Sequence, residues 1–312
     1  MSEQSWFLFA TAGAIIGAVV QIIDMYLRED GIFSHPLEPT IVSGVMQAML
    51  WVSIPFVGFE YPESGLIAGL AVLGGLFHIA SLFFYFKGVF SFGDMSVISM
   101  LWNLLVAMVP ILAFVLLGER LSALEYFGIL LLFVGALTLS FSEGVDTGLL
   151  PSVSKQMLIA VFLMGLSMVC LKGVYEHTTY WGGYLFYNFG IVGGGVLGYI
   201  FFLPRRTRRQ LHHTFRSFFF FFLGIEFLQL SGEFFSNLAT SLGPVSLVSA
   251  VESLQPLFIV IIALGIFLAG KALPWNQLKL LRPMCLAQFQ GLRVKVVAMV
   301  IMIFGVYLIQ YI

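Results

Sequence analysis

Long apolar runs separated by short polar connections fill this chain. A helix needs about 20 apolar residues to cross a hydrocarbon core of about 30 Å, and ten runs fit that length between glycines, prolines and charge clusters. The expected spans are residues 5–27, 39–59, 65–90, 95–117, 121–141, 156–174, 179–203, 215–241, 245–268 and 294–312. Two longer polar connections remain, 204–214 and 269–293. The pattern predicts an all-α membrane protein with ten transmembrane helices.

Composition supports this interpretation and narrows the expected partners. Of the 312 residues, 60% are hydrophobic and 10% are charged, whereas soluble domains carry about 25% charged residues, so a soluble fold is excluded. The net charge of −1 makes nucleic acid an unexpected partner. Cys170 and Cys285 form no disulfide framework or metal-binding spacing, and no metal or cofactor is expected. Because Glu3 and no basic residue precedes the first run, we interpret that run as a span rather than a signal peptide.

The chain carries a weak internal repeat. When it is shifted by 150 residues, the segment 84–99 lies over 234–249 and Gly93 meets Gly243. A further shift of 20, absorbed by the connection 269–293, aligns the fifth run with the tenth. The chain thus divides into two related halves.

We place the halves at residues 1–145 and 146–312, with five spans each. Because five is odd, the second half must cross the membrane in the opposite sense to the first. Inverted repeats of this kind are typical of secondary transporters, which bind substrate near the midplane where the halves meet. The repeat therefore predicts two inverted five-helix units around a central cavity.

Several glycines interrupt the third and seventh runs. They include Gly74 and Gly75 in the third run and Gly190 and Gly195 in the seventh. Small residues let helix backbones approach closely in lipid, so helix packing is the favoured interpretation and hinges in a moving protein are the alternative.

One part of the sequence resembles a known family. Gly118-Glu119-Arg120 ends the fourth run, and FGILLLFVGA follows at 127–136. These residues are similar to the end of the fourth span and the fifth span of EamA-type transporters of the drug/metabolite transporter superfamily. Pro256, after residues 249–255, resembles the matching ninth span. The resemblance covers most of the chain and implies a ten-helix carrier with a central cavity.

The second half departs from the family pattern. Residues 269–272 read AGKA where Glu-Arg is expected, and Val106 stands where the first half of the family usually has proline. Gly118, Glu119 and Arg120 form the structural motif, and we expect Glu119 and Arg120 to cap the fourth span as a pair.

The basic residues are distributed unevenly between the two sides of a ten-span arrangement. Thirteen of the fifteen fall on one side, and only Arg120 and Lys172 fall on the other. Because cytoplasmic loops are rich in Lys and Arg, this bias puts 204–214 in the cytoplasm and both termini outside. The family resemblance instead implies cytoplasmic termini. The orientation therefore stays open.

Three acids occur in the eighth and ninth predicted spans, and an ionisable residue within a span costs at least about 2.5 kcal/mol and is a functional candidate. Glu226 and Glu233 lie two helical turns apart in the eighth span, and Glu252 lies in the ninth. The same stretches carry amides at Gln229, Asn237 and Gln255. These six residues form the predicted centre of the substrate site.

The depth of two acids suggests a coupling mechanism. Glu233 and Glu252 lie at similar distances from the predicted turn at 242–244, so at about 1.5 Å per residue both sit about 14 Å into the membrane. If they share a cavity, each opposes ionisation of the other, and one keeps a proton. We expect this pair to couple solute movement to a proton gradient. The alternative is a pair of neutral carboxyl groups that join neighbouring helices.

The remaining polar and aromatic candidates indicate a class of solute. No arginine lies deep in a predicted span, so an anionic solute lacks its usual bidentate partner. Carboxylates with aromatic walls suit an amine-bearing, cationic or zwitterionic solute. The further candidate binding residues are Gln47, Trp51, His78, Trp102, Asn103 and Tyr187.

The function that the sequence favours is secondary transport of a small organic solute by alternating access, with proton coupling. The alternative is a permease or channel for a divalent cation such as Mg²⁺, and a membrane-embedded lipid enzyme is less favoured because no catalytic motif is evident. We expect no enzyme activity, membrane lipids and a small solute as partners, and a place in the plasma membrane, as in a bacterial inner membrane. The oligomeric state is left open, with a monomer compatible.

Overall fold

The computed structural model describes residues 5–29, 32–92, 95–141, 150–272 and 291–311, and these residues form helices and connections without a strand. The helices are α1 (Ser5–Glu29), α2 (Leu37–Met46), the 3₁₀ helix η1 (Gln47–Ser53), α3 (Ile54–Val57), α4 (Gly65–Phe92), α5 (Met95–Trp102), α6 (Leu105–Leu117), α7 (Ala123–Phe141), α8 (Leu150–Tyr175), α9 (Tyr180–Leu197), the π-helix η3 (Gly198–Phe202), α10 (Arg205–Ser217), α11 (Phe219–Leu242), α12 (Val245–Glu252), α13 (Gln255–Ala272) and α15 (Leu292–Tyr311).

Within the described residues, nine helical segments are long and apolar enough to cross a membrane. They match nine of the ten predicted spans. The segment predicted as the fifth span is helix α7, whose apolar stretch Ala123–Leu139 is shorter than the other nine. The helices fit an all-α integral membrane protein.

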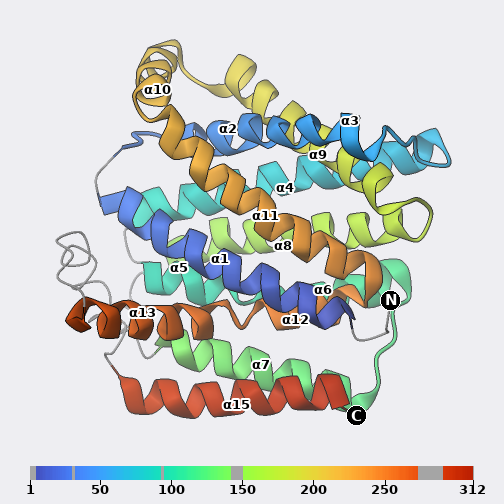
Figure 1. Cartoon of the computed structure of the whole chain (residues 1–312), viewed down its shortest axis with the longest axis vertical. Coiled ribbons are helices and arrows are strands. Elements are labelled where there is room, and N and C mark those ends of the chain that lie inside the picture. Colours follow the sequence, from blue (N-terminus) through green and yellow to red (C-terminus); the bar gives the residue numbers. More distant parts are fainter. Residues whose placement is uncertain (1–4, 30–31, 93–94, 142–149, 273–290, 312) are drawn as a thin grey trace.

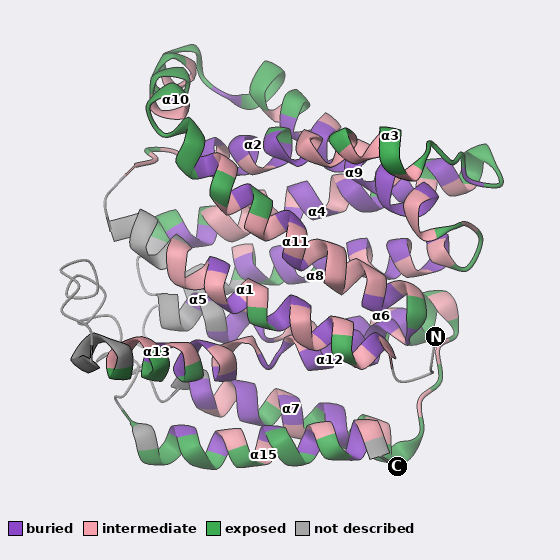
Figure 2. Cartoon of the chain, in the orientation of Figure 1, coloured by how far each residue is buried: buried purple, intermediate pink, exposed green. Residues whose placement is uncertain are grey.

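Large apolar side chains on the outside of the bundle agree with a lipid environment. Phe56, Phe220 and Leu66 are 86%, 83% and 76% exposed. Buried positions concentrate between the helices, as Figure 2 shows. A soluble protein rarely leaves so many large apolar side chains in water.

The helices lie side by side in one bundle, and both chain ends lie on the side of Figure 1 opposite α10. Helices α2, α3 and α9 form one edge of this view, and α7 and α15 form the other. Between these edges, α4 packs along α8 and α9, and α1 packs along α11. This arrangement leaves α1, α8, α11 and α12 around the middle of the bundle.

Two predicted spans are interrupted rather than continuous. The fourth is split into α5 and α6 at Asn103 and Leu104, and the ninth is split into α12 and α13 at Ser253 and Leu254. The second span also changes from α-helix to 3₁₀ helix at Gln47. Hydropathy cannot reveal such breaks, because a broken apolar segment has the same composition as an intact one.

Glycines bring the backbones of α4 and α9 together. A methyl group added at Gly75 would overlap the Tyr187 carbonyl oxygen, and one added at Gly190 would overlap that of Val72. The predicted close packing is correct at these positions. It does not extend along both helices, because a Cβ at Gly69 or Gly193 would meet nothing within 4 Å.

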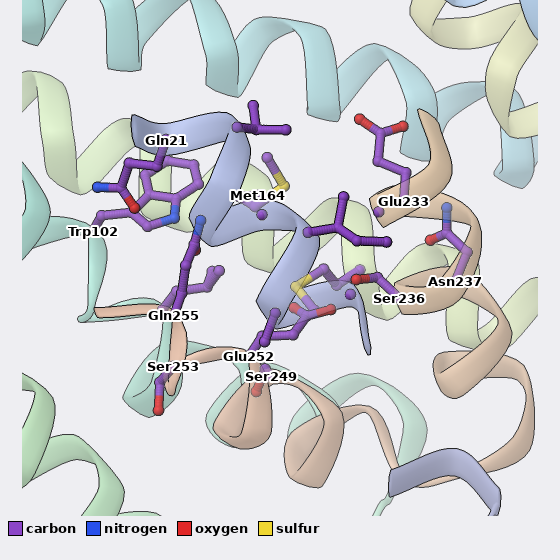
Figure 3. A pocket seen from close by; sticks show the side chains of 18 of the residues that line it. Gln21, Trp102, Met164, Glu233, Ser236, Asn237, Ser249, Glu252, Ser253 and Gln255 are labelled. Carbon is purple, nitrogen blue, oxygen red and sulfur yellow. The ribbon is translucent and has the colours of Figure 1, made fainter. Parts of the chain in front are cut away.

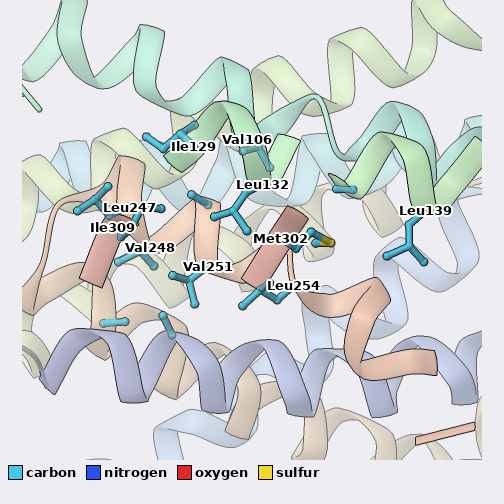
Figure 4. Close-up of a cluster of buried hydrophobic side chains, with 14 of the residues drawn as sticks. Val106, Ile129, Leu132, Leu139, Leu247, Val248, Val251, Leu254, Met302 and Ile309 are labelled. Atoms are coloured by element: carbon cyan, nitrogen blue, oxygen red, sulfur yellow. The ribbon is translucent and has the colours of Figure 1, made fainter. Parts of the chain in front are cut away.

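The largest apolar cluster lies beside the central part of the bundle. It joins α6, α7, α12 and α15 through side chains that include Val106, Leu132, Val251, Leu254 and Met302 (Figure 4). Leu254, at the break between α12 and α13, is part of this cluster. Apolar packing therefore anchors one flank of the interrupted helix.

The predicted polar connection 204–214 is a helix, which corrects the expectation of a loop. Residues Arg205–Ser217 form α10, which packs Leu211 into a cluster with Leu203 and Phe222. Leu211 and Phe215 lie four residues apart on one face and hold the helix against the bundle. The other long connection, 269–293, lies largely outside the described residues.

Candidate functional site

A cavity of about 300 Å³ lies inside the bundle (Figure 3). Its lining includes nine residues that the sequence singled out: His78, Trp102, Asn103, Tyr187, Gln229, Glu233, Asn237, Glu252 and Gln255. These side chains come from α4, α5 and the break after it, α9, α11, α12 and α13. The structure thus brings residues from both predicted halves to one space.

Both helix interruptions open onto this cavity. Trp102 and Asn103 line it at the first break, and Glu252 and Ser253 line it at the second. At each break the chain makes a short turn, with bonds from the Val106 N–H to Asn103 O and from the Leu254 N–H to Val251 O. Non-helical backbone at membrane depth is tolerated where it lines a cavity, and both breaks are in that setting.

Glu233 is held by amides on both of its carboxyl oxygens. Gln47 Nε2 donates to Oε2 at 2.8 Å, and Gln229 Nε2 donates to Oε1 at 3.0 Å. Asn188 Nδ2 in turn donates to Gln47 Oε1 at 2.9 Å and to the Gln47 carbonyl oxygen at 3.2 Å. The bond to Oε1 turns the Gln47 amide so that its N–H points at Glu233. An acid that accepts on both oxygens is suited to the ionised form.

Glu252 has a different environment. Figure 3 shows Glu252 beside Ser236 and apart from Glu233, and Ser236 lines the same cavity. Gln255 lies one turn further along the chain and approaches Gly17 of α1, where an added Cβ would lie 3.0 Å from Gln255 Nε2. The two acids therefore face one cavity with separate sets of partners.

His78 belongs to a buried hydroxyl chain at the wall of the cavity. Its Nδ1 lies 2.7 Å from the Tyr187 hydroxyl, which lies 2.8 Å from the hydroxyl of Ser167. Ser167 donates to the Gly74 carbonyl oxygen at 2.8 Å. With Ser167 donating to that carbonyl, it can accept from Tyr187, which leaves the tyrosine oxygen to accept from His78. This chain fixes the imidazole at the cavity.

Three predicted site residues do not line the cavity. Gln47 reaches it only through Glu233, whereas Trp51 packs edge-on against Phe189 with 5.2 Å between ring centroids. Glu226 is buried in α11, two turns from Glu233, and is absent from the lining. Spacing along a helix placed Glu226 and Glu233 on one stripe, but the cavity extends along only part of that stripe.

Several lining residues escaped the sequence reasoning. Gln21 on α1 and Ser236 on α11 line the cavity together with Ser249 and Ser253. One sequence signal for α1 was available: its Gly13 and Gly17 form a GxxxG motif, which marks a helix that another backbone approaches closely. A Cβ at Gly13 would overlap the Ser236 hydroxyl. Asn188, which orients Gln47, gave no signal beyond being an amide in an apolar run.

The Gly118-Glu119-Arg120 motif joins the end of α6 to the start of α12. Gly118 has a left-handed backbone with φ of 70° and ends α6, which is a common role for glycine. The Glu119 carboxylate then accepts bonds from the N–H groups of Val245 and Ser246 at 3.0 and 3.2 Å. The sequence predicted a cap on its own helix with Arg120, but Glu119 instead caps α12, and Arg120 is exposed.

A lysine strengthens this end of α12. Lys172 Nζ on α8 donates to the Gly243 carbonyl oxygen, in the turn between α11 and α12, at 2.9 Å. Glu119, just after α6, and Lys172 of α8 thus both hold the α11–α12 turn. A carboxylate at a helix N-terminus is favoured by the exposed N–H groups and by the helix dipole.

No family model matches the sequence, and no curated protein matches it. Among solved structures, one described only as "Crystal structure of protein" is similar, with a TM-score of 0.65 and 16% sequence identity. The similarity covers 98% of this chain and 96% of that chain. At this identity the similarity concerns the fold alone.

Proposed function

We propose that this protein is a secondary transporter that moves a small amine-bearing organic solute across a plasma membrane by alternating access. The observation that carries the proposal is the meeting of two interrupted helices at one cavity that contains two carboxyl groups. Secondary transporters commonly bind their solutes where discontinuous helices meet near the bilayer midplane. The EamA-type drug/metabolite transporters, which the sequence resembles, are the family that we infer, and a bacterial inner membrane is the setting that we infer.

We also propose ten spans in two inverted halves, with α7 as the fifth. The two breaks support the repeat, because Trp102 and Glu252, the last helical residues before them, are 150 positions apart. This is the same shift that aligns the two halves of the sequence. The packing of α1 along α11 is then equivalent to that of α8 along α4.

Contacts between matching helices support the same symmetry. With the shift of 170 that aligns α7 with α15, Gly128 corresponds to Ala298, and Gly135 corresponds to Gly305. A Cβ at Gly128 would lie 2.9 Å from Gly305 O, and one at Gly135 would lie 3.1 Å from Ala298 O. Each contact is thus the counterpart of the other, as a two-fold relation between the halves requires.

The charge of the cavity supports the solute class. Two carboxyl groups line it, together with the amides of Asn103, Gln229, Asn237 and Gln255 and the rings of Trp102 and Tyr187. No arginine or lysine is among the lining residues that the structure describes. A protonated amine can pair with a carboxylate and lie against an aromatic face.

The partners of the two acids support different roles. Glu233, with an amide donor on each oxygen, is the fixed anion that attracts the solute. Glu252 is the group that exchanges a proton for the amine: it releases its proton when the solute binds and regains one after the solute leaves. Because the cavity opens to one side of the membrane at a time, each exchange of a proton for the solute takes place on one side. The proton gradient therefore drives movement of the solute in the opposite direction.

Two experiments on purified protein test the proposed function. A thermal-shift screen of amines, amino acids and divalent ions first finds the tightest ligand. Radiolabelled ligand is then loaded by counterflow into proteoliposomes that contain unlabelled ligand, and we expect transient accumulation that saturates with concentration. Empty liposomes are the control.

Other outcomes would replace the proposal. Electrical conductance without counterflow, together with stabilisation by Mg²⁺ alone, would indicate a cation channel. Chemical change of the lipids would indicate a membrane-embedded enzyme.

A further inference from the structure

Helix α10 presents a strongly basic face that the cavity does not use. Its 13 residues include Arg205, Arg206, Arg208, Arg209 and Arg216 with two histidines, and no Asp or Glu. Such a density of positive charge is unusual in a chain with only 10% charged residues.

The two faces of α10 have separate roles. Leu211 is buried and Phe215 partly buried in a cluster with α2 and α11. Arg208 lies on the same side and donates from Nε to Leu203 O at 3.0 Å and from Nη2 to Ile200 O at 2.7 Å. Its guanidinium also lies 5.3 Å from the centre of the Tyr199 ring. These contacts fix the rotation of the helix.

The fixed rotation turns the other basic residues outward. Arg205, Arg209, His212 and Arg216 follow a helical spacing of three to four residues and form one exposed stripe, with Arg206 and His213 exposed beside it. Figure 2 shows α10 as mostly exposed at the edge of the bundle.

The position of α10 along the chain sets its depth. Leu203 and Pro204 separate it from the segment Tyr180–Phe202, and Phe218 separates it from Phe219–Leu242, both of which are long and apolar enough to cross a membrane. Phe201 and Phe202 before it are 70% and 71% exposed, and Phe220 after it is 83% exposed. With apolar rings on both sides in the chain, the helix is confined to the headgroup layer.

We propose that the exposed arginine stripe of α10 binds the headgroups of anionic phospholipids. A basic segment beside a membrane span gains about five-fold in affinity for an anionic surface with each added Lys or Arg. The contacts of Leu211, Phe215 and Arg208 fix the position of the stripe in the absence of bound lipid. Binding a lipid headgroup therefore costs little conformational entropy. This site is independent of the solute and of transport.

Native mass spectrometry of the full chain in detergent tests the proposal. Dioctanoyl phosphatidylglycerol is the anionic probe, and dioctanoyl phosphatidylcholine at equal concentration is the zwitterionic comparison. We expect selective retention of phosphatidylglycerol, weakened at least about ten-fold in the triple variant Arg205→Gln, Arg206→Gln, Arg209→Gln. The matched control, Lys87→Gln, Arg120→Gln, Lys155→Gln, removes three exposed charges elsewhere and is expected to bind as the wild type does.

Two further arms use the wild-type chain. High salt should weaken the selective binding, because exposed charges are screened. Glycerol 3-phosphate should not compete at equal concentration, because it lacks the acyl chains that concentrate a lipid at this face. Equal retention of both lipids by the wild type, or equal loss of selectivity in the two triple variants, would overturn the proposal.

Discussion

Two helices are interrupted beside the cavity, and the two interruptions carry different side chains. At the first, Trp102 and Asn103 face the cavity, and at the second, Glu252 and Ser253 do so. The turns are alike and lie 150 residues apart. The comparison separates architecture from chemistry, since the backbone break is present in both places and the acid in only one.

A second difference concerns how the interrupted helices begin. At the start of helix α12, the Glu119 carboxylate accepts a bond from the Val245 N–H, and Lys172 donates to the carbonyl oxygen of Gly243 in the preceding turn. The sequence at the corresponding place in the second half is AGKA at 269–272, which offers no acid. Glu119, which lies in the first predicted half, therefore holds the N-terminus of the acidic helix α12.

The largest expected effect comes from removing the acid at the second break. We expect Glu252→Gln to weaken binding of benzyltrimethylammonium, a quaternary amine with one aromatic ring, at least about thirty-fold. The reason is that removing one partner of a desolvated charge pair costs about 2–5 kcal/mol. Isothermal titration calorimetry of the purified protein measures this change.

The matched position supplies the control. Trp102→Phe keeps an aromatic ring at the first break and should weaken binding less than Glu252→Gln does. Equal losses in the two variants would mean that the two breaks contribute alike, and the distinction between them would fail.

A smaller effect is expected at Glu233, which lies on the uninterrupted helix α11. Gln47→Ala removes one donor from Glu233 and one acceptor from Asn188, which is fully buried. Asn188 keeps its bond to the Gln47 backbone carbonyl, but loss of a hydrogen-bond partner at a buried polar group still costs up to about 1–3 kcal/mol, so the melting temperature should fall. Gln229→Ala removes only the donor and should lower it less. If Gln229→Ala proves the more harmful change, the Asn188–Gln47 pair does not position Glu233.

The smallest effect concerns the cap on α12. Glu119→Gln leaves one carbonyl oxygen where two carboxylate oxygens accepted bonds, and loss of a cap costs about 1 kcal/mol. We expect a modest fall in melting temperature for Glu119→Gln and none for Arg120→Gln, whose side chain is exposed. A fall of the same size in both variants would indicate a general charge effect instead of a cap.

The sequence predicted nine long apolar helices that the described part of the chain contains, and their order, because length and hydropathy are local properties. It predicted Glu233 and Glu252 at one cavity by counting residues from the α11–α12 turn, and both line it. It did not find the breaks at Asn103 and Ser253, since these depend on the cavity beside them.

Contacts between segments far apart in the chain determine the residue roles that the sequence did not predict. Glu119 lies next to Arg120 in the chain, but it caps a helix more than 120 residues away, as its bond to Val245 shows. The arginine-rich segment 204–214 is mostly polar, yet Leu211 within it and Phe215 just after it give it a side that packs against the bundle as a helix. Gln47 was predicted to contact the solute, but it instead donates a hydrogen bond to Glu233.

The central claim is that the cavity acids exchange a proton for a cationic solute, and proton movement in proteoliposomes tests it most directly. Vesicles containing a trapped pH-sensitive dye are loaded with benzyltrimethylammonium and diluted into solute-free buffer. For the wild type, we predict that the interior becomes more acidic as the cation leaves, and that Glu252→Gln abolishes this change. Cation efflux from wild-type vesicles with no accompanying proton entry, or acidification that persists unchanged in Glu252→Gln, would contradict the account.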